Sequence, residues 1–329
     1  MANKPKILFS TNPNPRNRAL IDGLIPLDAY DLQYVGDKYT PGEMHYRFMQ
    51  GEFDVAEMST ATLMRAKEKG KRFLALPVFF QRGPRQRNIF YCEGNLKHPS
   101  DLKGKQIGAF RYGATAVSWA RGYLLDEHNI KTTDVGWFVS GQEVFIGNEL
   151  PVKVERLDPP PPFGQEKAHL SRLLSEGKLG AALVAGDSGY TGLFGGGSLP
   201  GVMGQNPGVK PLFDDTEEII RYVKRTQIYP IIHIMAMNEN TAEKYPDLPA
   251  KIIDAFREAN RQAVKYFKPG DAEGYAKERD LLGYDPYAGV LTEADKKSLQ
   301  ALNRYQIEQG LVKKELPLEN LFVKEAFRM

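Results

Sequence analysis

The stretch FDVAEMST at residues 53–60 begins as a β-strand and ends in polar groups, and the organisation of the chain can be worked out from it. Its first residues alternate apolar and other side chains, as in a half-buried strand. Glu57 and the hydroxyls of Ser59 and Thr60 then follow, and either hydroxyl could cap a helix. Open α/β sheets place their ligands at such strand-to-helix turns. The stretch therefore predicts an α/β fold with one wall of a ligand site here.

Short apolar runs alternate with helical patterns on both sides of this stretch, which predicts mostly parallel sheets covered by helices. The alternation restarts after a polar turn at 99–105, so we expect a second lobe. Only helical patterns follow the apolar strand at 228–237, as in a chain that returns to cover its first lobe. The predicted strands are 6–10, 32–35, 53–58, 73–80, 88–92, 106–110, 135–139, 181–185 and 228–237, and the predicted helices are 17–24, 41–50, 59–69, 114–128, 165–175, 216–226, 241–245, 249–267, 272–282 and 293–309.

We therefore expect one lobe from residues 1–92 with 236–329 and a second lobe from 93–235. Two crossings, near 89–92 and 229–235, would form a hinge with a cleft between the lobes. The whole chain resembles the type II periplasmic-binding-protein fold in this architecture, a resemblance that implies fold more strongly than function. A Gly- and Pro-rich segment at 192–208 is predicted to be a long surface loop.

Composition excludes several classes of protein. The chain has 329 residues, of which 44 are basic and 41 acidic, and the charges are well mixed, so nothing indicates a nucleic-acid binder. No apolar run approaches the ~20 residues of a membrane span. Cys92 is the single cysteine and cannot form an internal disulfide. With no signal-peptide pattern at the N-terminus, we expect a cytoplasmic protein; a disulfide-free exported protein is the alternative. The oligomeric state is left open, a homo-oligomer included.

The turn RYGATA, which starts at Arg111, lies between a predicted strand and a predicted helix. The backbone N–H groups of Gly113, Ala114 and Thr115 would point into the cleft, where a helix N-terminus with small residues can bind an anion. Arg111 could hold a carboxylate with two parallel hydrogen bonds. Alternatively, Thr115 serves only as a helix cap.

Three further arginines, Arg82, Arg85 and Arg87, surround a Gly-Pro pair between two predicted strands. Alternation along an extended segment would place Arg85 and Arg87 on one face, where both could bind a dianion. The alternative is a solvated basic loop. On the helix after the RYGATA turn, Trp119 is expected to pack, and Arg121 to pair with an acidic group.

Glu57 and His233 are the candidates for proton transfer. A carboxylate at a strand end can exchange protons if burial raises its pKa, or it can fix an arginine. His233 lies in an apolar strand, where it is either a satisfied core histidine or a general acid at the base of the cleft. The five histidines form no His-x-His or His-x-x-x-His pair, so no metal site is predicted.

Six segments in order resemble the 4,5-dihydroxyphthalate decarboxylase family. That resemblance implies an aromatic carboxy-lyase on the binding-protein fold that needs no organic cofactor. The family usually has a histidine where Asn88 stands, a Phe-Pro-Ile-Met-His run where YPIIH stands and an acidic residue near 111–112, so a different aromatic carboxylate substrate is plausible. The segments are FDVAEMS at 53–59, LPVF at 76–79, RQRNI at 85–89, DLKGK at 101–105, TAVSWARG at 115–122 and YPIIH at 229–233.

The resemblance also implies roles for single residues. His233 would donate a proton to the ring carbon that bears the departing carboxylate, and Glu57 would bond a ring hydroxyl or orient the histidine. A solute-binding receptor for an anionic small molecule is the alternative function, and an intracellular sensor or a cofactor-biosynthesis enzyme is a third. The expected substrate contacts are Ser59, Arg82, Arg85, Arg87, Arg111, Tyr112, Gly113, Ala114 and Thr115.

Overall fold

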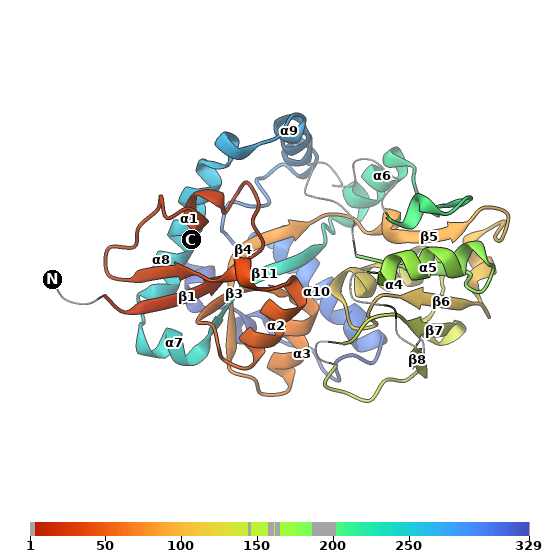
Figure 1. Cartoon of the computed structure of the whole chain (residues 1–329), viewed down its shortest axis with the longest axis horizontal. Helices are drawn as coiled ribbons and strands as arrows, with labels where there is room; N and C mark the ends of the chain where they lie inside the picture. The colour runs from red at the N-terminus through yellow and green to blue at the C-terminus, as the bar shows by residue number, and fades with distance from the viewer. Residues whose placement is uncertain (1–3, 144–145, 157–160, 162–164, 186–201, 329) are drawn as a thin grey trace.

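The computed structural model describes residues 4–143, 146–156, 161, 165–185 and 202–328. Two sheets lie one beyond the other along the long axis of the molecule, with helices packed around each (Figure 1). The strand order is β2-β1-β3-β11-β4 in the first sheet and β10-β5-β9-β6-β7-β8 in the second. The expected two-lobed α/β architecture is confirmed.

The first sheet combines parallel strands from the start of the chain with one strand that returns much later. β1, β2 and β3 are parallel, and β11 lies antiparallel between β3 and β4. In this register His233 on β11 is the partner of Ser59 on β3. Side chains two residues apart share a face of a strand, so Glu57 and Ser59 point the same way as His233. The bounds are β1 Lys6–Ser10, β2 Asp31–Tyr34, β3 Val55–Ser59, β4 Phe73–Arg82 and β11 Ile231–Asn238.

The second sheet has a parallel centre, β9-β6-β7-β8, and an antiparallel edge made by β5 and β10. Two of its strands, β8 and β10, were not predicted, because three residues are too few to show a period of two. The bounds are β5 Ile89–Cys92, β6 Gln106–Ala109, β7 Gly136–Val139, β8 Val154–Arg156, β9 Ala181–Leu183 and β10 Val209–Pro211.

Two adjacent segments, residues 83–88 and 227–230, connect the sheets. The Gly83 N–H donates to the Pro230 carbonyl at 2.9 Å, which ties the two crossings together. Gly83 has a φ of 121°, a conformation that side-chain-bearing residues rarely adopt. β5 pairs wholly in the second sheet and β11 wholly in the first, so the crossings fall a few residues before the expected positions. The lobe boundaries at 92 and 235 remain a prediction.

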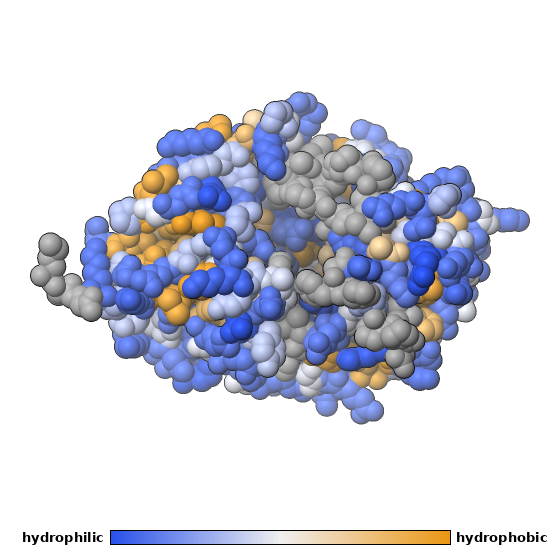
Figure 2. All heavy atoms as spheres, in the orientation of Figure 1, coloured by the Kyte–Doolittle hydropathy of each residue, from blue (hydrophilic) through white to orange (hydrophobic). Residues whose placement is uncertain are grey.

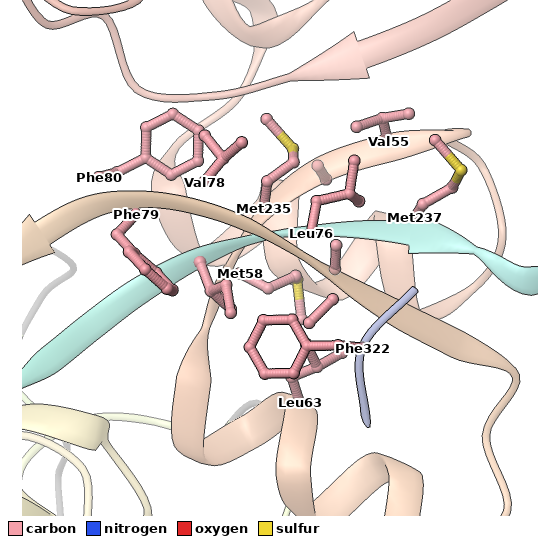
Figure 3. Close-up of a cluster of buried hydrophobic side chains, with 14 of the residues drawn as sticks. Val55, Met58, Leu63, Leu76, Val78, Phe79, Phe80, Met235, Met237 and Phe322 are labelled. Atoms are coloured by element: carbon pink, nitrogen blue, oxygen red, sulfur yellow. The ribbon is translucent and has the colours of Figure 1, made fainter. Parts of the chain in front are cut away.

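Side chains of β3, β4 and β11 form the core on both faces of the first sheet, and on one face Met58 and Phe79 lie near Leu63 and Phe322 (Figure 3). The chain returns to this sheet after β11, as predicted, and α8 and α10 complete its cover. α10 also packs on α4, where a Cβ added to Gly122 would lie only 2.3 Å from the Tyr305 ring. A glycine at this position therefore permits the close approach of the two helices.

Most predicted helices are confirmed, with shifts at their ends. The predicted helix 249–267 stops at Arg261 and a separate 3₁₀ turn follows, while the predicted helix 17–24 shortens to four residues. Most of the expected loop at 192–208 lies outside the described residues. Within the described part of the chain, no helix has the length and apolarity to cross a membrane. The helices are α1 Arg18–Ile21, α2 Pro41–Met49, α3 Thr60–Glu68, α4 Thr115–His128, α5 Glu166–Ser175, α6 Thr216–Thr226, α7 Glu239–Lys244, α8 Leu248–Arg261, α9 Asp271–Leu282, α10 Glu293–Glu308 and α11 Leu318–Leu321.

Candidate active site

A cavity of about 400 Å³ lies between the two sheets. Figure 2 shows the molecule hollowed near its middle, where the two halves meet. One wall comes from β3, β11 and the start of α2, and the other comes from the turn before α4 and from Glu143. The cavity therefore lies between the two stretches in which the sequence predicted ligand contacts, 53–60 and 111–116. We call these stretches the two half-sites.

Glu57 and His233 are hydrogen-bonded to each other in the wall formed by β3 and β11. Glu57 Oε1 lies 2.6 Å from His233 Nδ1. Its Oε2 accepts hydrogen bonds from Thr11 Oγ1 and from the Asn12 backbone N–H, each at 2.8 Å. Glu57 is only 3% exposed, so these three protein atoms, and not solvent, hold the carboxylate in place.

The surroundings of Glu57 keep it ionised. Burial alone would raise its pKa, but the hydrogen bond and charge of His233, together with the bonds from Asn12 and Thr11, lower that pKa to about 2. The carboxylate holds Nδ1 of His233, which leaves Nε2 as the ring nitrogen for a ligand. His233 lines the cavity, so its place is the one expected for a general acid at the base of the cleft.

A second imidazole, His45 on α2, was not predicted. Its ring lies edge-on to His233, with the ring centroids 5.3 Å apart and the planes at 81°. His45 is 5% exposed, and its Nε2 is buried without a hydrogen-bond partner in the described ranges of the chain. Burial and then the charge of His233 lower its pKa to about 3, so His45 is neutral at physiological pH. No sequence spacing relates the two histidines, because their contact depends on tertiary packing.

Arg85 is a buried cation on the cavity wall, and no carboxylate of the described residues pairs with it. It is 6% exposed, and its Nε and Nη2 have no hydrogen-bond partner within the part of the chain that the structure describes. Nη1 makes one long contact, 3.4 Å to Asn88 Oδ1. Burial lowers the pKa of Arg85 to about 10, which still leaves it charged at neutral pH. A buried guanidinium with open donors suits an anionic ligand.

Arg82 and Arg87 differ from Arg85, because each pairs with a carboxylate. The guanidinium of Arg82 forms a buried salt bridge with Asp295 at 2.6 Å and donates to the Pro286 carbonyl, so it joins β4 to α10. Arg87 does not line the cavity and pairs with Asp214 at 2.8 Å. The expectation that Arg85 and Arg87 share a face is wrong, because residues 86–88 form a 3₁₀ turn instead of an extended segment.

The turn before α4 forms the opposite wall, with Gly113, Ala114 and Thr115 on the cavity. The Gly113 N–H donates to both carboxylate oxygens of Glu143, at 3.1 and 3.2 Å. Thr115 does not cap its helix. Instead its Oγ1 lies 2.7 Å from Ser59 Oγ and accepts from Ala61 N–H at 3.0 Å. Ser59 likewise makes no cap, so the two hydroxyls join the walls to each other.

Arg111 reaches across the cavity toward α2, where a Cβ added to Gly42 would lie 3.1 Å from its Nη2. Tyr112 does not line the cavity, because it is fully buried against Trp137 at a centroid distance of 5.3 Å. Its expected role in substrate contact is therefore replaced by packing. Arg121 pairs with Gln309 at 2.7 Å, not with the expected acidic group, and Trp119 packs as predicted.

Among the residues that the structure describes, no group of three or more His, Cys, Asp or Glu side chains could hold a metal ion.

Comparison with known sequences gives two relatives. The chain is 28% identical over 260 residues to 4,5-dihydroxyphthalate decarboxylase of Comamonas testosteroni, covering 76% of this chain and 73% of that protein. It is 30% identical over 189 residues to 4,5-dihydroxyphthalate decarboxylase of Pseudomonas putida, covering 55% of this chain and 70% of that protein. No protein-family model matches the chain.

Comparison with solved structures supports the fold. The periplasmic aliphatic sulphonate binding protein SsuA of Escherichia coli aligns with a TM-score of 0.59 and 13% identity, over 99% of this chain and 100% of SsuA. The desulfurization enzyme DSZB aligns with a TM-score of 0.54 and 12% identity, over 99% of this chain and 98% of DSZB. One of these proteins is named for binding and the other for catalysis, so the fold alone does not separate a receptor from an enzyme.

Proposed function

The chain belongs to the 4,5-dihydroxyphthalate decarboxylase family, and from this premise we propose that it decarboxylates an aromatic dicarboxylate such as 4,5-dihydroxyphthalate without an organic cofactor. Its family makes it an enzyme of the lyase class. The observation that carries the proposal is one cavity that holds two groups. One is the buried cation Arg85, which has no carboxylate partner among the described residues, and the other is the imidazole of His233, held by a carboxylate.

The reaction needs one proton and no electron acceptor. A hydroxyl para to a ring carboxylate pushes electron density toward the carbon that bears the carboxylate, and that carbon takes up a proton. The bond to the carboxylate then breaks, CO2 leaves, and the bonding electrons return to the ring and restore aromaticity. From 4,5-dihydroxyphthalate the products are CO2 and 3,4-dihydroxybenzoate.

In this proposal His233 delivers the proton from Nε2, because Nδ1 is held by Glu57. Both oxygens of Glu57 already have partners, which favours orientation of the histidine over contact with a ring hydroxyl. The imidazole is re-protonated from solvent after each turnover.

Arg85 is proposed to hold one carboxylate, and the turn from Arg111 to Thr115, which includes Gly113, to hold the other. Orienting the ring against His233 supplies most of the advantage that a protein can offer such a reaction. The carboxylate that departs must leave as neutral CO2, so a site that excludes water near it favours the step. The buried position of Arg85 suits the carboxylate that stays.

A solute-binding receptor for an anionic molecule is the second candidate function. The fold is compatible with it, because the sulphonate binding protein SsuA has a similar structure. A receptor would need Arg85 but no proton donor. The cytoplasmic location and any homo-oligomeric state stay predictions.

The test is incubation of the purified protein with 4,5-dihydroxyphthalate and a panel of aromatic mono- and dicarboxylates, with CO2 release measured for each. We expect CO2 and 3,4-dihydroxybenzoate in equal amounts from 4,5-dihydroxyphthalate, or CO2 from a related hydroxylated acid. Tight binding across the panel with no CO2 from any acid would refute the decarboxylase and support the receptor.

A further inference from the structure

A carboxylate of the chain itself occupies the helix N-terminus that the sequence marked as an anion site. Glu143 lines the cavity, and both of its oxygens accept from the Gly113 N–H. Glu143 lies between β7 and β8, outside any helix or strand, so moving its side chain breaks no regular backbone hydrogen bonding.

A buried guanidinium faces the same point. Arg65 on α3 is 1% exposed and donates from Nη2 to Thr62 Oγ1 at 3.1 Å and from Nη1 to Gln306 Oε1 at 3.1 Å. Burial lowers the pKa of Arg65 to about 10, and the negative charge of Glu143 opposes that shift. The carboxylate therefore compensates a cation that would be costly to bury alone.

Gly113 brings these groups together because it has no side chain. A Cβ at this position would lie 2.9 Å from Arg65 Nη2 and 3.1 Å from Glu143 Oε2. The backbone amide, the guanidinium and the carboxylate thus meet where any other residue would intrude.

A second observation in the same cavity points independently to a ligand. Arg85 lines it, is more than nine-tenths buried and has two nitrogens without partners among the residues that the structure describes. The cavity therefore offers an anion position at the buried Arg85 and, at the turn that begins with Arg111, a carboxylate position occupied by Glu143, which matches the two carboxylates of a dicarboxylic acid.

We propose that Gly113 N–H and Arg65 form a carboxylate subsite, which Glu143 fills until a carboxylate of the substrate displaces it. This inference rests on the proposed function. Exchange of one carboxylate for another leaves the buried Arg65 compensated before and after binding. Glu143 is then an internal competitor that weakens ligand binding and takes no part in the proton transfer.

The test is calorimetric titration of the whole protein with phthalate, which has both carboxylates but no ring hydroxyl and so does not undergo the proposed reaction. Glu143→Gln should tighten phthalate binding about tenfold, because the competing state is lost. Glu149→Gln makes the same charge change at an exposed position of the same segment and should leave affinity unchanged.

Two further variants separate competition from general electrostatics. Glu143→Asp keeps the charge but shortens the reach to Gly113 N–H, so competition predicts tighter binding, about threefold, whereas a long-range charge effect predicts no change. Gly113→Ala fills the subsite and should weaken phthalate binding at least tenfold.

Unchanged or weaker phthalate binding by Glu143→Gln would overturn the inference, as would equal effects of Glu143→Gln and Glu149→Gln or no phthalate binding by any variant. The proposed function fails on a different result, the absence of CO2 from every hydroxylated acid. The expected order of phthalate affinities could still be observed in that case.

Discussion

The two walls of the cavity differ in how completely their charged groups are satisfied. On the β3 and β11 wall, every oxygen of Glu57 has a protein partner, and the Glu57 carboxylate holds one nitrogen of His233. Elsewhere around the cavity, Arg85 in the crossing segment has donors without partners among the described residues, and on the opposite wall the amide of Gly113 is occupied by the chain's own Glu143. A fixed wall suits transfer of a proton to one atom, and a wall with open or exchangeable positions suits binding of an anion.

Replacement of His233 should have the largest effect on the fixed wall. His233→Gln removes the proposed proton donor and should lower the rate of CO2 release by about 10³-fold, within the range for loss of a general acid. Phthalate affinity, measured by calorimetry, should change less than threefold because the arginines remain. His98→Gln, at an exposed position far from the cavity, is the matched control. Retained CO2 release would eliminate His233 as the donor.

Glu57→Gln should slow CO2 release by about 10- to 100-fold, since the amide orients His233 less well.

The same variant tests the lowered pKa of Glu57 through the pH dependence of stability. A carboxyl whose pKa is lowered on folding stabilises the protein above its unfolded pKa of roughly 4.3, and this contribution is lost as pH falls toward 2. Urea unfolding should therefore show a stability difference between wild type and Glu57→Gln of ~3 kcal/mol at pH 7 that shrinks below pH 4.5. A difference that stays constant down to pH 3 would contradict the lowered pKa of Glu57.

Arg85→Met tests the open anion position in the crossing segment. Phthalate affinity should fall about 10- to 100-fold, because a charge-assisted contact is lost. The unliganded protein should unfold at equal or higher urea concentration, with a gain of about 1 kcal/mol, since an uncompensated buried charge is removed. Arg87→Met, which lies off the cavity, should leave affinity unchanged. Loss of stability together with unchanged affinity would assign Arg85 a structural role.

The smallest effect is expected at His45. His45→Phe keeps the edge-on contact with His233 and should hold the rate of CO2 release within about threefold, whereas His45→Ala removes the contact and should lower it about tenfold. The measurement is kcat across pH 5 to 9 for both variants. Equal losses in the two would mean that the nitrogen atoms of His45, and not its packing, support the reaction.

Much of the fold was predictable because its signals are local. Apolar alternation marked β3, a nearly continuous apolar run marked β11, and the strand-to-helix turns at 53–60 and 111–116 were recognisable from a few adjacent residues. The arginine segment was misjudged because a single 3₁₀ turn at 86–88 changes the direction of each side chain. Tyr112 was misplaced for a similar reason, since packing against Trp137 turns it away from the cavity.

The sequence by itself determined the two-sheet α/β fold, the resemblance to the decarboxylase family and the two half-sites, because strand and helix periods, turn residues and short motifs depend only on near neighbours. Only the tertiary structure decided that Glu57 meets His233, 176 residues away, that His45 lies edge-on to that histidine and that Glu143 occupies the turn before α4. Such contacts depend on strand order and on the packing of one sheet against the other, and no local pattern contains that information.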